Sequence, residues 1–70
     1  MDKDLLLYYM RKADIDTAEL AKRLNLSTKT VYNKLNGVTE FTASEIREVA
    51  KACSIGGRGI IEIFFTDYVN

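Results

Sequence analysis

The hydrophobic positions of the chain recur at helical spacing in several segments that short polar or glycine-containing stretches separate. Apolar residues three or four positions apart predict amphipathic helices, because about 3.6 residues make one helical turn. The pattern is clearest in two short helices within residues 17–37, whose inner faces carry Leu20, Leu24, Val31 and Leu35. An all-α fold is therefore expected.

The residues around these two helices suit a tight turn between them. Asp16 is placed to cap the first helix, with Glu19 three residues later to close a capping box. Asn25 tolerates the left-handed backbone that a chain needs in order to leave one helix and turn into the next. Ser27 or Thr28 then caps the second helix. This arrangement predicts a helix-turn-helix, which is a reader of DNA.

A first helix is predicted to begin at Asp2 or Asp4, upstream of this pair. Its apolar residues fall on more than one stripe. One face carries Leu5, Tyr8, Tyr9 and Lys12, and Leu6 and Met10 lie beside it.

A fourth helix is predicted after Gly37, which supplies a left-handed stop. Thr42 and Glu45 have the spacing of a capping box at its start, and Phe41 is expected to close the core from the preceding loop. The apolar face of this helix carries Ile46, Val49, Ala50 and Cys53. Cys53, as the single cysteine, is interpreted as a small core residue.

Residues 56–70 fit two structures. The three glycines within residues 56–59 suggest a hinge or turn, and five large apolar side chains follow in the next six positions. A short fifth helix is favoured, with a strand over residues 58–66 as the alternative. The helical stripe is the candidate for a homodimer contact, with core packing as the other reading, and it consists of Ile61, Phe64, Phe65 and Tyr68.

The segment from Leu20 to Val31, which reads Leu-Ala-x-x-Leu-x-Leu-Ser-x-x-Thr-Val, resembles the helix-turn-helix of the Cro and phage-repressor family, also called lambda-repressor-like or XRE. The resemblance continues to Cys53 and covers roughly residues 4–55. Asn25 departs from it, standing where the family usually has glycine, and so does Leu35, since many members place this anchor one residue earlier. The resemblance implies a five-helix bundle that regulates transcription by occupying a DNA operator, as a homodimer in the manner of the family.

In a helix-turn-helix the second helix enters the major groove by its N-terminal half. The candidates for contacts with base edges are therefore Ser27, Thr28, Lys29, Tyr32 and Asn33. A lysine donates to guanine and an asparagine bonds adenine in two places, although each of these side chains could equally hold a phosphate. The candidates for phosphate contacts are Thr17, Lys34, Asn36 and Thr39.

Composition and charge limit the number of domains and the kinds of partner that the sequence suggests. Seventy residues, 47% hydrophobic and 29% charged, are expected to form a single globular domain over residues 1–70. Ten basic and ten acidic residues cancel, which argues against nucleic acid as a partner, but the stretch from Leu20 to Thr39 carries four basic residues and no acid. The neutral charge and the apolar C-terminal segment support an alternative, a protein-interaction module that uses the same helical fold.

Chemistry other than binding has little support in the sequence. The chain has no histidine, one cysteine and no phosphate-binding loop, so no enzyme, metal site, cofactor or small-molecule substrate is expected. No apolar run approaches the roughly 18 residues of a membrane span, and no secretory signal is recognisable. A cytoplasmic protein is the expectation.

Overall fold

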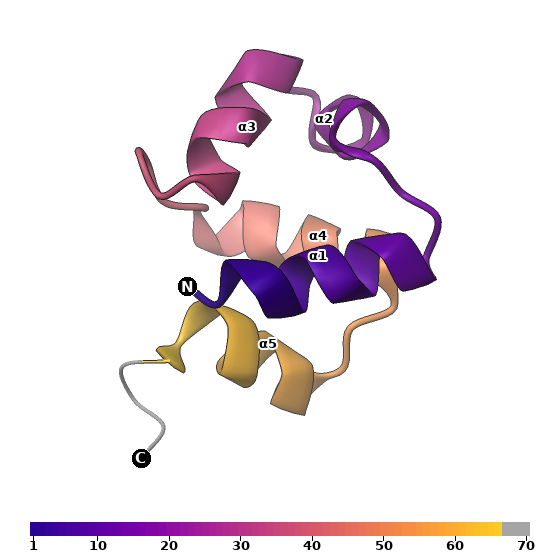
Figure 1. Ribbon diagram of the computed structural model, residues 1–70, viewed down its shortest axis with the longest axis vertical. Helices are drawn as coiled ribbons and strands as arrows, with labels where there is room; N and C mark the ends of the chain where they lie inside the picture. Colours follow the sequence, from indigo (N-terminus) through magenta and orange to yellow (C-terminus); the bar gives the residue numbers. More distant parts are fainter. Residues whose placement is uncertain (67–70) are drawn as a thin grey trace.

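Five helices make up the chain between residues 1 and 66, the part that this computed structural model describes. They are α1 (Lys3–Lys12), α2 (Thr17–Leu24), α3 (Thr28–Leu35), α4 (Ala43–Cys53) and α5 (Gly57–Phe64). In Figure 1, α2 and α3 lie above α1 and α4, and α5 lies below them. The predicted all-α architecture is confirmed, and no strand occurs within the described residues.

The structure decides between the alternative helix starts. Asp2 is the N-cap of α1, since its side chain accepts a hydrogen bond from the backbone N–H of Leu5 at 3.1 Å. Ser27, and not Thr28, caps α3 by accepting from the backbone N–H of Thr30 at 3.1 Å. Each cap satisfies one of the N–H groups that the first turn of a helix leaves without an intrahelical partner.

One of the two predicted capping boxes forms completely. At α4, the side chain of Thr42 accepts from the backbone of Glu45 and the Glu45 carboxylate accepts from the backbone of Thr42. At α2, the Asp16 side chain accepts from the Glu19 backbone at 2.8 Å, as predicted. The Glu19 carboxylate does not return the bond but accepts from Arg23 Nε at 3.1 Å, because an arginine one turn later is within reach on the same helix face.

Asn25 and Gly37 both have the left-handed backbone that the sequence predicted, with φ of 58° and 80°. Two further residues have the same left-handed conformation, which the sequence did not predict. They are Asp14 (φ 58°), between α1 and α2, and Ser54 (φ 54°), at the end of α4.

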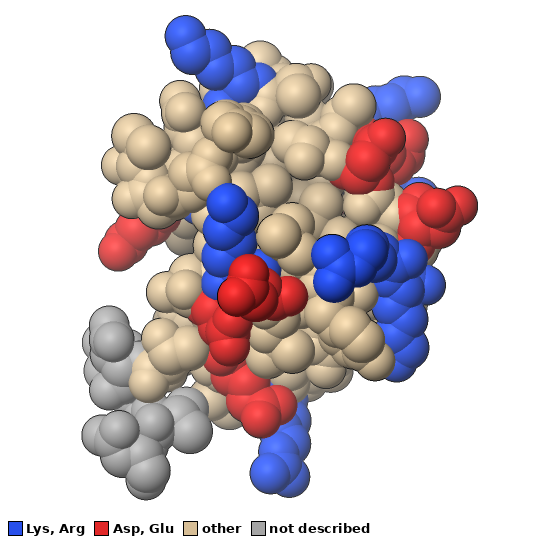
Figure 2. All heavy atoms as spheres, viewed as in Figure 1, with Lys and Arg blue, Asp and Glu red and all other residues tan. Residues whose placement is uncertain are grey.

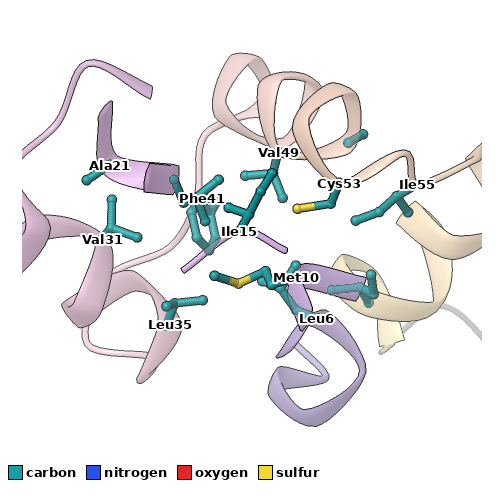
Figure 3. Close-up of a cluster of buried hydrophobic side chains, with 13 residues drawn as sticks. Leu6, Met10, Ile15, Ala21, Val31, Leu35, Phe41, Val49, Cys53 and Ile55 are labelled. Carbon is teal, nitrogen blue, oxygen red and sulfur yellow. The ribbon is translucent and has the colours of Figure 1, made fainter. Parts of the chain in front are cut away.

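The buried side chains form one hydrophobic cluster to which all five helices contribute, as Figure 3 shows. Val31 and Leu35 anchor α3 in it, and Phe41 and Cys53 are buried as predicted. The structure identifies the inner face of α1, which the sequence left open between two stripes. Its buried residues are Leu6 and Met10, whereas Tyr8 and Lys12 of the other face are exposed. The two stripes of α1 were both apolar, so periodicity alone did not identify the inner one.

The favoured fifth helix is confirmed as α5, which excludes the alternative strand and includes two of the three glycines that suggested a hinge or turn. Gly56 is its N-cap and Gly57 its first residue, so these glycines begin the helix. Gly59 is buried where a Cβ atom would lie 2.7 Å from Ile55 Cγ2 and 3.1 Å from the Tyr9 hydroxyl oxygen, which explains why glycine is needed there. The backbone N–H of Asp2 donates to the carbonyl of the α5 residue Ile63 at 2.7 Å and joins the start of α1 to the last turn of α5.

Two members of the predicted C-terminal apolar stripe do not pack in the core. Ile63 is fully buried, and Phe64 packs edge-to-face on Phe41 with ring centroids 5.7 Å apart. Ile61 and Phe65 are exposed. Tyr68, the remaining member of the predicted stripe, lies outside the described residues.

Candidate nucleic-acid interface

The turn that joins α2 to α3 is only three residues long. At its start, the backbone N–H of Asn25 donates to the carbonyl of Lys22 and that of Leu26 donates to the carbonyl of Ala21, at 3.2 and 2.9 Å. The left-handed Asn25 makes both bonds possible because it reverses the chain at the helix end. Ala21 is buried, and its small side chain lets the two helices approach closely. The two helices are thereby held as a compact unit.

The outer face of α3 carries polar side chains from its N-terminal half. Val31 and Leu35 point into the core, which leaves Thr28, Lys29 and Tyr32 exposed. Tyr32 is 60% exposed, so most of its side chain is accessible to a partner. Asn33 is partly exposed at the side of this face. Four of the five predicted base-edge candidates therefore lie on or beside one accessible helix face.

The fifth candidate, Ser27, is occupied by the helix cap. Its hydroxyl accepts from the Thr30 backbone and donates to the Thr30 hydroxyl oxygen at 2.8 Å. The structure thus uses this side chain to begin α3.

The four predicted phosphate candidates fall in different environments. Thr17 is the first residue of α2 and is partly buried, and Thr39 is exposed in the loop between α3 and α4. Asn36 is exposed at the end of α3, where its side-chain oxygen accepts a hydrogen bond from the Lys3 ammonium. Lys3 was not predicted at this site, because only the fold brings the start of α1 beside the end of α3.

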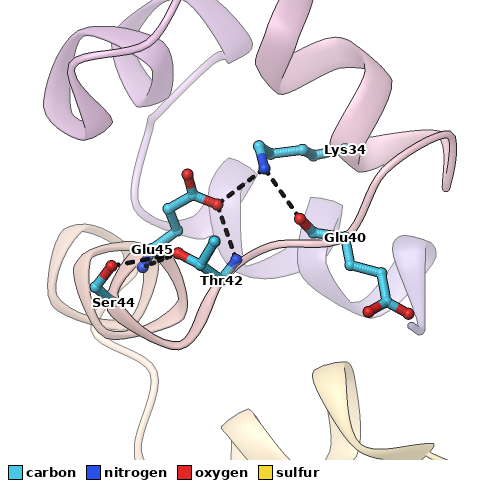
Figure 4. A network of polar contacts seen from close by, with 5 residues as sticks. All are labelled: Lys34, Glu40, Thr42, Ser44 and Glu45. Carbon is cyan, nitrogen blue, oxygen red and sulfur yellow. Dashed lines mark hydrogen bonds and ion pairs between the residues drawn. The ribbon is translucent and has the colours of Figure 1, made fainter.

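Lys34, the fourth phosphate candidate, is engaged inside the molecule. Its ammonium lies 3.0 Å from Glu45 Oε1 and donates to the Glu40 carbonyl at 2.9 Å, as Figure 4 shows. It also lies 5.9 Å from the centroid of the Phe41 ring. The Lys34 side chain is only 10% exposed. Its ammonium is therefore held between α3 and the start of α4, away from the face that carries Lys29.

Glu45 is the acceptor at the centre of this network. The backbone N–H of Thr42, followed by the Lys34 ammonium, holds the pKa of the Glu45 carboxyl below its ordinary value, and this outweighs the opposing effect of burial. The charged carboxylate is thus the favoured form in the folded protein.

The basic charge around α2 and α3 is smaller than the sequence count suggests. Arg23 is paired with Glu19, and Lys34 with Glu45. Within residues 1–66, Lys22 and Lys29 remain as basic side chains of these two helices without an ion pair. In the view of Figure 2 the surface over α3 is mostly uncharged, with a basic side chain at its upper edge.

Residues 1–66 contain no group of three or more His, Cys, Asp or Glu residues that could hold a metal ion. Burial raises the pKa of the Cys53 thiol, which keeps it in the unreactive protonated form. None of the helices in this part of the chain is long and apolar enough to cross a membrane.

Comparison with known families agrees with this geometry. The sequence profile of the Cro/C1-type HTH DNA-binding domain matches residues 6–56, which include all of α2, α3 and α4. The comparisons with curated proteins and with solved structures gave no match.

Proposed function

Since the chain belongs to the Cro/C1-type helix-turn-helix DNA-binding family, we propose that it is a sequence-specific transcriptional regulator that acts by occupying an operator in double-stranded DNA. The observation that carries this proposal is the outer face of α3. Thr28, Lys29 and Asn33 lie on or beside this face, while Val31 and Leu35 fix the opposite side of the helix in the core.

Each of these side chains has a partner in the major groove. Lys29 donates to guanine O6 or N7, Asn33 forms two hydrogen bonds with adenine, and the Thr28 methyl group contacts a thymine methyl. Tyr32, one turn after Thr28, adds a large exposed surface and a hydroxyl. Ser27 contributes by holding the start of α3 through its cap.

Phosphate contacts set the register of α3 on the duplex. Thr17 at the start of α2, Asn36 at the end of α3 and Thr39 in the following loop are assigned to this role. Lys34 is left out because its ammonium is held by Glu45. With few unpaired basic residues near α3, non-specific binding is weak, so useful affinity depends on base contacts and on pairing of two subunits.

We assign that pairing to a homodimer. Ile61 on α5 is 49% exposed, and Phe65, which directly follows the helix, is 40% exposed, so the C-terminal segment offers apolar surface to a second subunit. Phe64 packs on Phe41 and belongs to the core side of the same segment. Two recognition helices about 34 Å apart reach successive major grooves on one side of the DNA, so two weak half-sites combine into one stronger site.

The same exposed apolar residues favour a second candidate function, that of a protein-interaction module. Salt separates the two candidates, because DNA binding weakens steeply with rising salt whereas apolar pairing of proteins hardly responds.

The proposal is tested with a duplex selected from random sequences by the wild-type chain. We expect Lys29→Ala to weaken binding to this duplex by about 1 to 3 kcal/mol, and the triple variant Thr28→Ala, Lys29→Ala, Asn33→Ala to lose the preference for it over a scrambled duplex. Lys51→Ala is the matched control, since it removes one positive charge from α4. If the triple variant keeps the wild-type affinity, the assignment of α3 is refuted.

A further inference from the structure

The interaction between Lys34 and Glu45 joins the last turn of α3 to the first turn of α4. The two charged atoms are 3.0 Å apart, and the Lys34 ammonium also donates to the carbonyl of Glu40, in the loop between the helices. The side chains are 10% and 17% exposed, so water screens the pair much less than a pair on the surface.

One carboxylate oxygen of Glu45 makes two of the contacts at this junction. Glu45 Oε1 accepts the backbone N–H of Thr42 at 2.9 Å and meets the Lys34 ammonium at the same time, as the dashed lines in Figure 4 show. The capping box therefore fixes the direction in which the carboxylate points. Lys34, and with it the end of α3, is held relative to the axis of α4.

Besides this junction, one other directional side-chain contact reaches the end of α3 within the described residues, the hydrogen bond that the Lys3 ammonium donates to the side-chain oxygen of Asn36. Helix α3 packs chiefly against α2, and α2 in turn against α4. Leu35 anchors the last turn in the core, but apolar contacts have little directionality. An eight-residue helix is about 12 Å long, so a tilt of about 10° moves one end by about 2 Å relative to the other. A recognition site tolerates only about 0.5 Å.

We propose that Lys34 and Glu45 are positioning residues for DNA recognition, which hold α3 at the angle that brings Thr28, Lys29 and Asn33 to the base edges without touching DNA themselves. This inference rests on the proposed function and deepens it. It differs from the sequence-based expectation, in which Lys34 contacts a phosphate.

A purely electrostatic role of Lys34 and a positioning role predict effects of opposite sign on DNA affinity when Glu45 is replaced. If the pair acts only through the local charge, Glu45→Gln removes a negative charge near the DNA and tightens binding to every duplex. If it positions α3, Glu45→Gln weakens binding to the selected duplex alone. The amide oxygen of glutamine still accepts the Thr42 N–H, so the substitution leaves the capping box in place and removes the charge that holds Lys34.

The experiment measures affinities for the selected and the scrambled duplex over a range of salt concentrations, at a temperature where circular dichroism shows each variant fully folded. For Glu45→Gln we expect about a tenfold loss on the selected duplex, the size of one lost base contact. Affinity for the scrambled duplex and the salt slope stay unchanged. Glu48→Gln is the matched control, because it makes the same charge change on α4 in a more exposed pair with Lys51, and it leaves the preference intact.

The double variant Lys34→Met, Glu45→Gln separates positioning from stability. It leaves no charge without a partner at the junction, so it folds at least as well as either single variant. We expect its melting temperature to be close to that of the wild type while the preference for the selected duplex stays reduced. Recovery of the preference along with stability would overturn the proposal.

Two other results would also overturn it. One is a folded Glu45→Gln variant that binds the selected duplex as tightly as the wild type. The other is a Lys34→Met variant that weakens both duplexes equally and lowers the salt slope by about one, which marks a phosphate contact. A wild-type chain that does not distinguish the two duplexes refutes the proposed function itself, whereas the other results leave that function standing.

Discussion

Single residues decide where the helices of this chain begin and turn. The left-handed turn at Asn25 was predicted from the sequence, and Ser27 was one of two candidates for the cap of α3, because caps and left-handed turns depend on residues only a few places away. The pairing of Lys34 with Glu45 was not predicted, because it forms across a loop and depends on how α3 and α4 pack. Local sequence signals do not carry that information.

The conformation of Asn25 leads to a prediction about stability. Glycine adopts φ near 58° without steric cost, so we expect Asn25→Gly to leave the free energy of unfolding unchanged or slightly higher. Valine is strained there, and Asn25→Val is expected to lower it by at least about 1 kcal/mol. Urea unfolding measures both. Lys22→Val, at an exposed helical position of α2, controls for the low helix propensity of valine. Equal stability of Asn25→Val and wild type would contradict the boundary between α2 and α3.

At the scale of elements, all five helices were predicted, but the inner faces of two were not. In α3 a polar outer face contrasts with Val31 and Leu35, so the pattern determined its rotation. In α1 and α5 apolar residues lie on several sides. The choice between Ile61 and Ile63 as the buried residue of α5 depends on the close approach of this helix to α1, which the sequence does not reveal.

Gly59 tests that close approach. Gly59→Ala places a methyl group 3.1 Å from the Tyr9 hydroxyl oxygen on α1 and 2.7 Å from Ile55 Cγ2 in the loop before α5, and we expect it to lower the free energy of unfolding by about 1 to 3 kcal/mol. Gly57→Ala is the matched control on the same helix, because its Cβ meets nothing within 4 Å. Alanine there restricts the unfolded chain and is expected to stabilise by about 0.4 to 1 kcal/mol. Thermal and urea unfolding that rank the two variants in the reverse order would show that α5 packs differently.

For the molecule as a whole, the count of basic residues along the sequence was a poor guide to the positive charge that the surface carries. The sequence places four basic residues between Leu20 and Thr39, but Arg23 and Lys34 are paired in the structure. Both pairs use acids outside that stretch. Glu19 lies one turn from Arg23 on α2, and the fold brings Glu45 to Lys34. Few unpaired basic side chains are therefore available near α3 for contacts with phosphates.

Self-association is the corresponding prediction for the whole molecule. We expect the wild-type chain to form dimers at high micromolar concentration in sedimentation velocity. The double variant Ile61→Ser, Phe65→Ser is expected to be monomeric, with the same helical circular dichroism and weaker binding to the selected duplex. Phe64 is kept, because its contact with Phe41 makes it part of the core. A wild-type chain that stays monomeric without DNA would leave the dimer unsupported.

The central claim is that the outer face of α3 reads DNA, and amide NMR mapping tests it most directly. The isotope-labelled chain is titrated with the selected duplex and, in parallel, with the scrambled one. We predict that the largest shift changes with the selected duplex fall on residues 28–33 and at the start of α2, and that the scrambled duplex causes small changes there. Changes confined to α5, with α3 unaffected by either duplex, would contradict the account.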